Sequence, residues 1–127
     1  MEKRNNIIYW TTTIFLVFGM LAGGVQQLLQ IGGYVDIAYQ LGYPLYFLSI
    51  LGLWKILGVM VLLIPKAPLV KEWAYAGFFF AMSGAVISHI AIGHTINEIF
   101  PSLILLIVTI LSWYFRPQDR KPVLINT

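Results

Sequence analysis

The stretch PLYFLSILGLWKILGVMVLLIP, residues 44–65, decides the fold class of this chain. It is a long apolar segment with a proline at each end and a single charged residue, Lys55, inside it. An α-helix needs about 20 apolar residues to cross the ~30 Å hydrocarbon layer of a bilayer, and prolines favour helix boundaries. We therefore predict that residues 44–64 form a membrane-spanning helix with a lysine near its middle.

The composition of the whole chain also favours a membrane protein. Of its 127 residues, 59% are hydrophobic and only 10% are charged, and the mean hydropathy is +0.82. Soluble domains average about 45–50% apolar and about 25% charged residues. A chain this short cannot hide so much apolar surface from water, so lipid must cover part of it. We expect one membrane domain over residues 1–127.

Three further apolar stretches, at residues 7–30, 73–92 and 100–115, are the other candidate spans. None of them alternates apolar and polar residues, as the strands of membrane barrels do. Together with residues 44–64 they predict an all-α, polytopic membrane protein with a four-transmembrane-helix bundle.

Small residues mark the helix faces on which packing is expected. In lipid, helices associate through close contacts and interhelical hydrogen bonds, which favours small side chains at the interface. On residues 73–92 the small-residue face comprises Ala74, Gly77, Ala81, Gly84, Ala85 and Ser88. On residues 7–30 the corresponding face comprises Thr12, Gly19, Ala22, Gly23, Gln26 and Gln30. We predict that these two faces meet inside the bundle.

The distribution of basic residues predicts the orientation. With four crossings, one side of the membrane holds Lys3, Arg4, Lys66, Lys71, Arg116, Arg120 and Lys121. The loops on the other side, residues 31–43 and 93–99, contain no Lys or Arg. Because cytoplasmic segments carry the excess of basic residues, we predict that both termini are cytoplasmic. The basic residues are dispersed at helix ends, so the net charge of +3 does not indicate nucleic-acid binding.

Lys55 is the basic residue that this rule does not explain. A lysine at the centre of a spanning helix costs about 2.5–3.5 kcal/mol on insertion scales, so it calls for a role. Helical side chains lean toward the N-terminus of their helix, so Lys55 is expected to lean toward the outer half. Among the acidic residues on that side, Glu98 is the predicted ionic partner, ahead of Asp36. The alternative is a lysine that snorkels to the outer headgroups without a specific partner.

Other polar residues are predicted to share the outer half with Lys55. The candidate ligand-binding or buried polar cluster comprises Lys55, His89, Gln26, Gln27, Glu98 and Trp54. A metal site is not predicted, because His89 and His94 are five residues apart, whereas a helical metal site favours a spacing of four. Gly93 is also expected to end the helix between the two histidines. The chain has no cysteine, which excludes thiolate metal ligation and thiol–disulfide chemistry within it.

Three motifs carry a resemblance to a known family. They are GLWKILG at residues 52–58, IPKAPLVKEWAYAGFFF at residues 64–80 and SGAVISH at residues 83–89, followed by a last helix that starts at a proline. Over roughly Tyr9–Trp113 the chain resembles the DoxX-like family of small membrane proteins. The resemblance implies a four-helix bundle in the bacterial inner membrane. Relatives are linked to quinone-dependent thiosulfate oxidation and to oxidative-stress complexes, and distant eukaryotic ones help receptors assemble; no catalytic residue carries over.

Two functions of different kinds follow as hypotheses. In the first, the chain binds a small lipophilic ligand, a quinone or a lipid, in the outer half of the bundle, or serves as a small subunit of a membrane redox complex. In the second, it is a non-enzymatic assembly or chaperone-like protein that stabilises a partner membrane protein. In either case, we expect the protein to lie in the lipid bilayer and to associate with a partner membrane protein or with further copies of itself. No catalytic activity is expected of this chain alone.

Overall fold

The computed structural model describes residues 2–117, 120 and 121, and the chain is helical throughout most of this range. The helices are α1 (Glu2–Leu29), α2 (Tyr34–Leu41), α3 (Leu45–Leu63), α4 (Pro68–Ala91) and α5 (Ile96–Tyr114). The described residues contain no strand, so the all-α prediction is confirmed. Four of the helices, α1, α3, α4 and α5, are long and apolar enough to cross a membrane, which confirms the predicted spans.

Helix α1 begins at Glu2 instead of residue 7, and the last two spans also begin earlier than predicted. Helix α4 starts at Pro68 instead of residue 73, because a proline fits the first turn of a helix, where its missing N–H is not needed. Helix α5 starts at Ile96 instead of residue 100, so that Pro101 lies inside the helix. The extra turns contain polar or charged residues, and an apolar pattern alone does not detect them.

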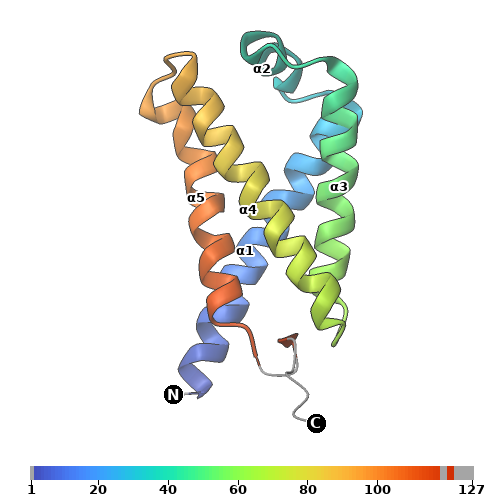
Figure 1. Cartoon of the computed structure of the whole chain (residues 1–127), viewed down its shortest axis with the longest axis vertical. Helices are drawn as coiled ribbons and strands as arrows, with labels where there is room; N and C mark the ends of the chain where they lie inside the picture. The colour runs from blue at the N-terminus through green and yellow to red at the C-terminus, as the bar shows by residue number, and fades with distance from the viewer. Residues whose placement is uncertain (1, 118–119, 122–127) are drawn as a thin grey trace.

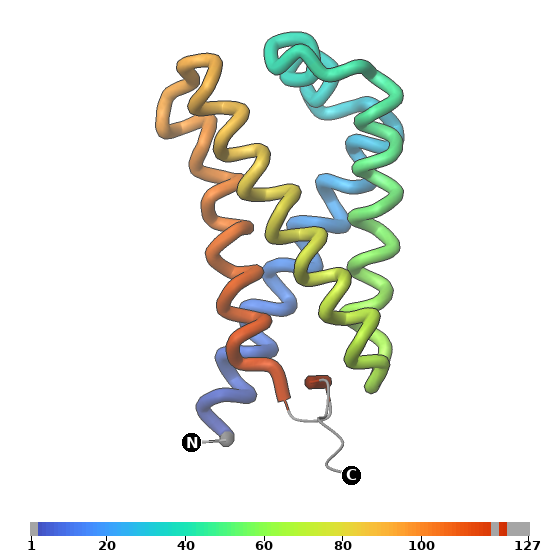
Figure 2. Tube along the Cα trace, viewed as in Figure 1, coloured from blue at the N-terminus to red at the C-terminus, as the bar shows by residue number. Residues whose placement is uncertain are grey.

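The predicted loop at residues 31–43 contains the short helix α2. It is bounded by Gly33 and Gly42, whose positive φ angles of 84° and 80° turn the chain at both ends. Figure 2 shows this segment curling over the end of α3 at the top of the molecule, on the side opposite the N-terminus. We call this the upper end, and the end with the N-terminus and the α3–α4 turn the lower end.

The helices pack as two pairs that diverge toward the upper end (Figure 1). Helix α1 packs mainly against α3 and α5, and α4 packs against α5 and α3. The predicted contact between the small-residue faces of α1 and α4 is therefore wrong. A Cβ added at Gly77 or Gly84 of α4 would have no atom within 4 Å, because these glycines border open space rather than a helix.

Glycines instead bring α1 and α3 together. A Cβ at Gly52 would lie 2.5 Å from the carbonyl oxygen of Gly24 and 2.6 Å from the backbone nitrogen of Leu28. Only glycine permits this approach of two backbones, as in other close contacts between membrane helices. The crossing holds α1 against α3, and α4 diverges from this pair toward the upper end (Figure 1).

The hydrophobic core lies in the lower half of the bundle. The buried cluster comprises Leu16, Met20, Val59, Leu62, Tyr75, Phe78 and Met82. Below it, Ser112 of α5 hydrogen-bonds to Thr13 of α1 at 2.6 Å and to the hydroxyl of Tyr75 of α4 at 2.8 Å. Interhelical hydrogen bonds of this kind hold helices together in lipid. The lower half is thus closed by packing, and the open space lies above it.

Two buried cations complete the lower end. The Lys71 amine donates to the carbonyls of Val61 and Ile64, and Arg120 donates to the carbonyl of Leu62 at 2.7 Å. These carbonyls belong to the last turn of α3, where they lack a helical partner and where the helix dipole favours a cation. Lys71 and Arg120, two of the basic residues on which the predicted orientation rests, thus also cap the C-terminal end of α3. Asp119, which follows the last helix in the sequence, lies outside the described residues.

Candidate ligand-binding site

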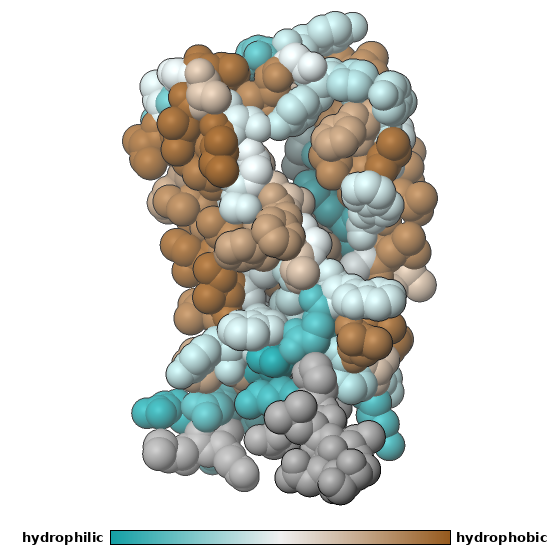
Figure 3. Space-filling model, viewed as in Figure 1, coloured by the Kyte–Doolittle hydropathy of each residue, from teal (hydrophilic) through white to brown (hydrophobic). Residues whose placement is uncertain are grey.

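A cavity of about 590 Å³ opens between the diverging upper halves of the helices; we call it the upper cavity. Its walls come from all five helices, and its polar lining includes Gln26, Gln27, Tyr34, Gln40, Lys55, His89, His94, Asn97, Glu98 and Ser102. In Figure 3 a recess lies between the α3 side and the α4–α5 side, with hydrophilic surface in its depth and hydrophobic surface on both flanks. Five of the six predicted candidate residues therefore line one space.

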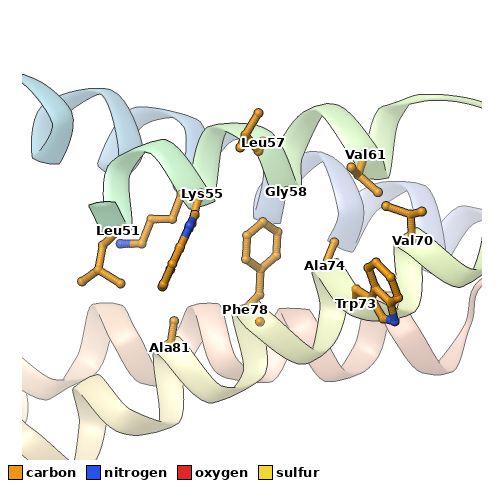
Figure 4. Close-up of a pocket in the computed structure, with 12 residues that line it drawn as sticks. Leu51, Lys55, Leu57, Gly58, Val61, Val70, Trp73, Ala74, Phe78 and Ala81 are labelled. Atoms are coloured by element: carbon orange, nitrogen blue, oxygen red, sulfur yellow. The ribbon is translucent and has the colours of Figure 1, made fainter. Parts of the chain in front are cut away.

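Lys55 lies at the inner wall of this cavity. Its side chain is only 8% exposed, and Figure 4 shows its amine directed along α3 toward Leu51, the direction that the sequence predicted. A Cβ at Gly23 of α1 would lie 4.0 Å from the Lys55 Nζ and 3.1 Å from the hydroxyl of Tyr34. The amine and the phenol thus both approach Gly23. Among the described residues, none forms a hydrogen bond or an ion pair with Lys55.

The predicted ion pair between Lys55 and Glu98 is therefore not formed. Glu98 lies in the first turn of α5, where its carboxylate is 3.0 Å from the Nδ1 of His94, one helical turn away. The hydroxyl of Thr95 also donates to it, at 3.3 Å. These local partners hold Glu98 at the mouth of the upper cavity, half exposed. Both residues line the cavity, but the carboxylate is engaged elsewhere.

The two histidines lie close together at the mouth of the cavity. Gly93, with φ 80°, turns the chain after α4, as predicted, and so returns His94 to His89 with their Nδ1 atoms 2.6 Å apart. The Nε2 of His94 lies 3.0 Å from the side-chain oxygen of Gln40 of α2. A second hydrogen bond, between Tyr43 and Ser88, joins the same two sides. The mouth is therefore spanned by polar contacts instead of apolar packing.

The glutamines of α1 differ in their surroundings. Gln27 is 6% exposed, and its Oε1 has no hydrogen-bond partner among the described residues. Gln26 is exposed at the cavity beside Gly32. Gln30, further along the helix, donates to the carbonyl of Leu45 at 3.2 Å and to the hydroxyl of Ser49 at 3.3 Å. Gln27 is thus a second buried polar residue of the cavity wall, and its side-chain oxygen is enclosed and has no partner among the described residues.

Trp54 does not line the upper cavity with the other candidates. Its side chain is 61% exposed and borders a second space of about 490 Å³, the α3–α4 groove, drawn in Figure 4. The groove is lined by Leu51, Trp54, Lys55, Leu57, Gly58, Val61, Val70, Trp73, Ala74, Gly77, Phe78 and Ala81. Three of these residues, Leu51, Lys55 and Ala81, also line the upper cavity. The two spaces therefore adjoin at Lys55.

Tyr34 is a site residue that was not among the candidates predicted from the sequence. Burial raises the pKa of its phenol, so the hydroxyl keeps its proton and remains a hydrogen-bond donor at neutral pH. A signal was present in the sequence. Tyr34, Ala38 and Leu41 recur at helical spacing between Gly33 and Gly42, as in a short amphipathic helix.

The arrangement of helices and cavity defines a multi-pass helical membrane protein that has a polar cavity between apolar walls. Comparison with known families then gives the particular group: a model of the DoxX-like family matches residues 11–111. The chain therefore belongs to the DoxX-like family, and the resemblance seen in the sequence is confirmed. No curated protein and no solved structure matches it.

Proposed function

We propose that this protein binds a small lipophilic ligand, quinone-like or lipid, in the upper cavity, with the polar end of the ligand at Lys55. The observation that carries the proposal is a buried lysine that has no partner among the described residues and lines a cavity of about 590 Å³. Sites for small molecules have volumes of about 300–1,000 Å³ and combine apolar walls with a few convergent polar groups. The upper cavity has both properties.

The energetics support the same proposal. A buried charge that lacks a partner is strongly unfavourable, and an ionisable residue inside a membrane marks a functional site by default. A ligand that accepts hydrogen bonds from Lys55 and Tyr34 would offset this penalty. The chain would retain such a lysine, in place of a leucine, because the ligand completes its surroundings.

The family suggests how the ligand would be used. A quinone carbonyl accepts hydrogen bonds, so Lys55 and Tyr34 suit a quinone head, and a chain that only holds a quinone fits a small subunit of a membrane redox complex. The described side chains include no group of three His, Cys, Asp or Glu residues placed to hold a metal ion. We propose binding without catalysis by this chain alone.

We place the protein in the bacterial inner membrane with both termini cytoplasmic. The support is the segregation of basic residues: the lower end holds all the basic residues except Lys55, whereas residues 31–43 and 93–99 of the upper end have none. In this orientation the upper cavity opens in the outer half of the membrane.

Thermal unfolding in neutral detergent tests the proposal. A short-chain quinone or a lipid should raise the unfolding temperature of the wild type, because a ligand that binds only the folded state stabilises it. The matched variant is Gly84→Leu, which places a side chain in the upper cavity where no atom lies within 4 Å of the new Cβ. It should fold and lose the stabilisation. Equal shifts for both proteins, or none for either, would contradict binding in this cavity.

One observation favours the alternative, an assembly protein that stabilises a partner. A Cβ at Gly77 on the α3–α4 groove would have no atom within 4 Å, and small residues without a packing partner are typical of helix–helix contacts in membranes. This function predicts that the chain co-purifies with a larger membrane protein and that Gly77→Leu, rather than Gly84→Leu, abolishes the association.

A further inference from the structure

The upper cavity has an excess of positive charge and hydrogen-bond donors at its inner wall. The Lys55 amine and the Tyr34 hydroxyl approach the same point above Gly23, and the buried amide of Gln27 lies on the same helix one turn further. The unmatched atom of that amide is an enclosed acceptor oxygen, so the donors of this spot are the amine and the phenol. These groups come from α3, α2 and α1, so three helices converge on one polar spot.

The acidic residue that lines the cavity, Glu98, does not neutralise the charge of Lys55. Glu98 is held at the mouth by His94 and Thr95 and forms no ion pair with Lys55. The other lining residues are neutral or are histidines. A ligand head that carries its own negative charge would supply what the protein lacks, because a charge-assisted hydrogen bond is roughly twice as strong as a neutral one.

The α3–α4 groove adjoins this spot and is apolar along its whole length. Apart from Lys55, every residue that lines it is apolar or glycine. On α3 the lining runs from Leu51 to Val61, which at 1.5 Å per residue is about 15 Å along the helix. Figure 4 shows Phe78 directed at Gly58 across the groove, with Trp73 and Val70 toward the end away from Lys55. The apolar lining thus extends from Lys55 along α3, and the Phe78 ring, packed on Gly58, forms its floor midway.

From this continuity we infer that the ligand is an amphiphile with an anionic head and one long hydrocarbon chain, as in a long-chain carboxylate. The head lies at Lys55 and Tyr34, and the hydrocarbon chain lies in the α3–α4 groove. The inference rests on the proposed function and specifies its ligand. The groove favours a hydrocarbon chain because, apart from the lysine at one end, its lining residues carry no charge and offer only the indole N–H groups of Trp54 and Trp73 as polar groups.

Titration of the purified full-length protein with ligands in neutral detergent, followed by native mass spectrometry, tests whether the head group of the ligand is anionic. Oleate should bind at least ~10-fold more tightly than oleyl alcohol, which has the same chain and no charge, as expected for one charge-assisted hydrogen bond. Lys55→Gln should remove this preference and leave the alcohol unaffected. Lys66→Gln changes the net charge equally but lies in the α3–α4 turn, so it should not alter oleate binding.

A second variant tests the position of the ligand's hydrocarbon chain. Gly77→Leu fills the groove without a contact within 4 Å of its Cβ, so it should weaken the binding of both oleate and oleyl alcohol. Equal affinity for oleate and oleyl alcohol would overturn the anionic head. Indifference of oleate to Gly77→Leu, or a two-chain phospholipid or a second polypeptide in the groove, would overturn the single chain. If none of the probes binds, and if Gly84→Leu does not alter the ligand-dependent rise in unfolding temperature, the proposed function itself fails.

Discussion

The two buried lysines of this chain have opposite surroundings. Lys71 donates to the carbonyls of Val61 and Ile64 at the end of α3, whereas Lys55 has no partner among the described residues. Removing a buried group that satisfies others leaves those groups unpaired, but removing an unpartnered charge relieves a penalty. The same substitution should therefore have opposite effects at the two positions.

We expect Lys55→Met to raise the unfolding temperature of the ligand-free protein, and Lys71→Met to lower it by the equivalent of about 2–4 kcal/mol. Thermal unfolding in the same detergent measures both effects. Adding Glu98→Gln to the wild type or to the Lys55→Met variant should give the same small change, because Glu98 pairs with His94. A loss of stability in Lys55→Met, or a strong coupling with Glu98, would show that the lysine has a structural partner in the protein.

At the scale of the helices, two glycines that look alike in the sequence have different roles. Gly52 lies where α3 crosses α1, and a Cβ there would lie 2.5 Å from a backbone oxygen. Gly84 borders the upper cavity and has no atom within 4 Å of its Cβ position. Membrane helices use glycine for close approach, but only the first of these two positions requires it.

Gly52→Ala should therefore separate α1 and α3 and lower the unfolding temperature, by the equivalent of about 1–3 kcal/mol. Gly84→Ala should be neutral or stabilising, by up to ~1 kcal/mol, because alanine is the better helix former. Equal effects of the two substitutions on thermal unfolding would contradict the helix crossing described above.

The sequence was sufficient to predict which segments form membrane-spanning helices, but not which of these helices pack against one another. Hydrophobic length predicted the four spans, and the position and lean of Lys55 followed from helix geometry. The partners of α1 could not be predicted, because small residues mark both helix contacts and cavity walls. The engagement of Glu98 was missed for a different reason: His94 lies four residues before Glu98, and this local contact outcompetes the more distant charge of Lys55.

For the whole molecule, the open upper end and the basic lower end give it a direction across the membrane. The upper end carries the α2 segment and the mouth of the cavity, and the lower end carries the buried caps Lys71 and Arg120. If the basic residues set the orientation, the cavity faces the outer half of the bilayer.

Because the chain has no cysteine, single-cysteine labelling tests this orientation directly. Tyr39→Cys on α2 is exposed at the upper end and should react with a membrane-impermeant maleimide in intact cells. Lys66→Cys in the α3–α4 turn should react only after the cells are permeabilised. The reverse pattern would overturn the orientation but not the cavity.

The central claim is that the upper cavity holds a lipophilic ligand through Lys55, and native mass spectrometry of the protein as purified tests it most directly. We expect wild-type protein to retain a small lipophilic molecule through mild detergent, and the stably folded Gly84→Leu and Lys55→Met variants to lose it. Ligand-free wild type, or the same bound mass in all three proteins, would contradict the claim.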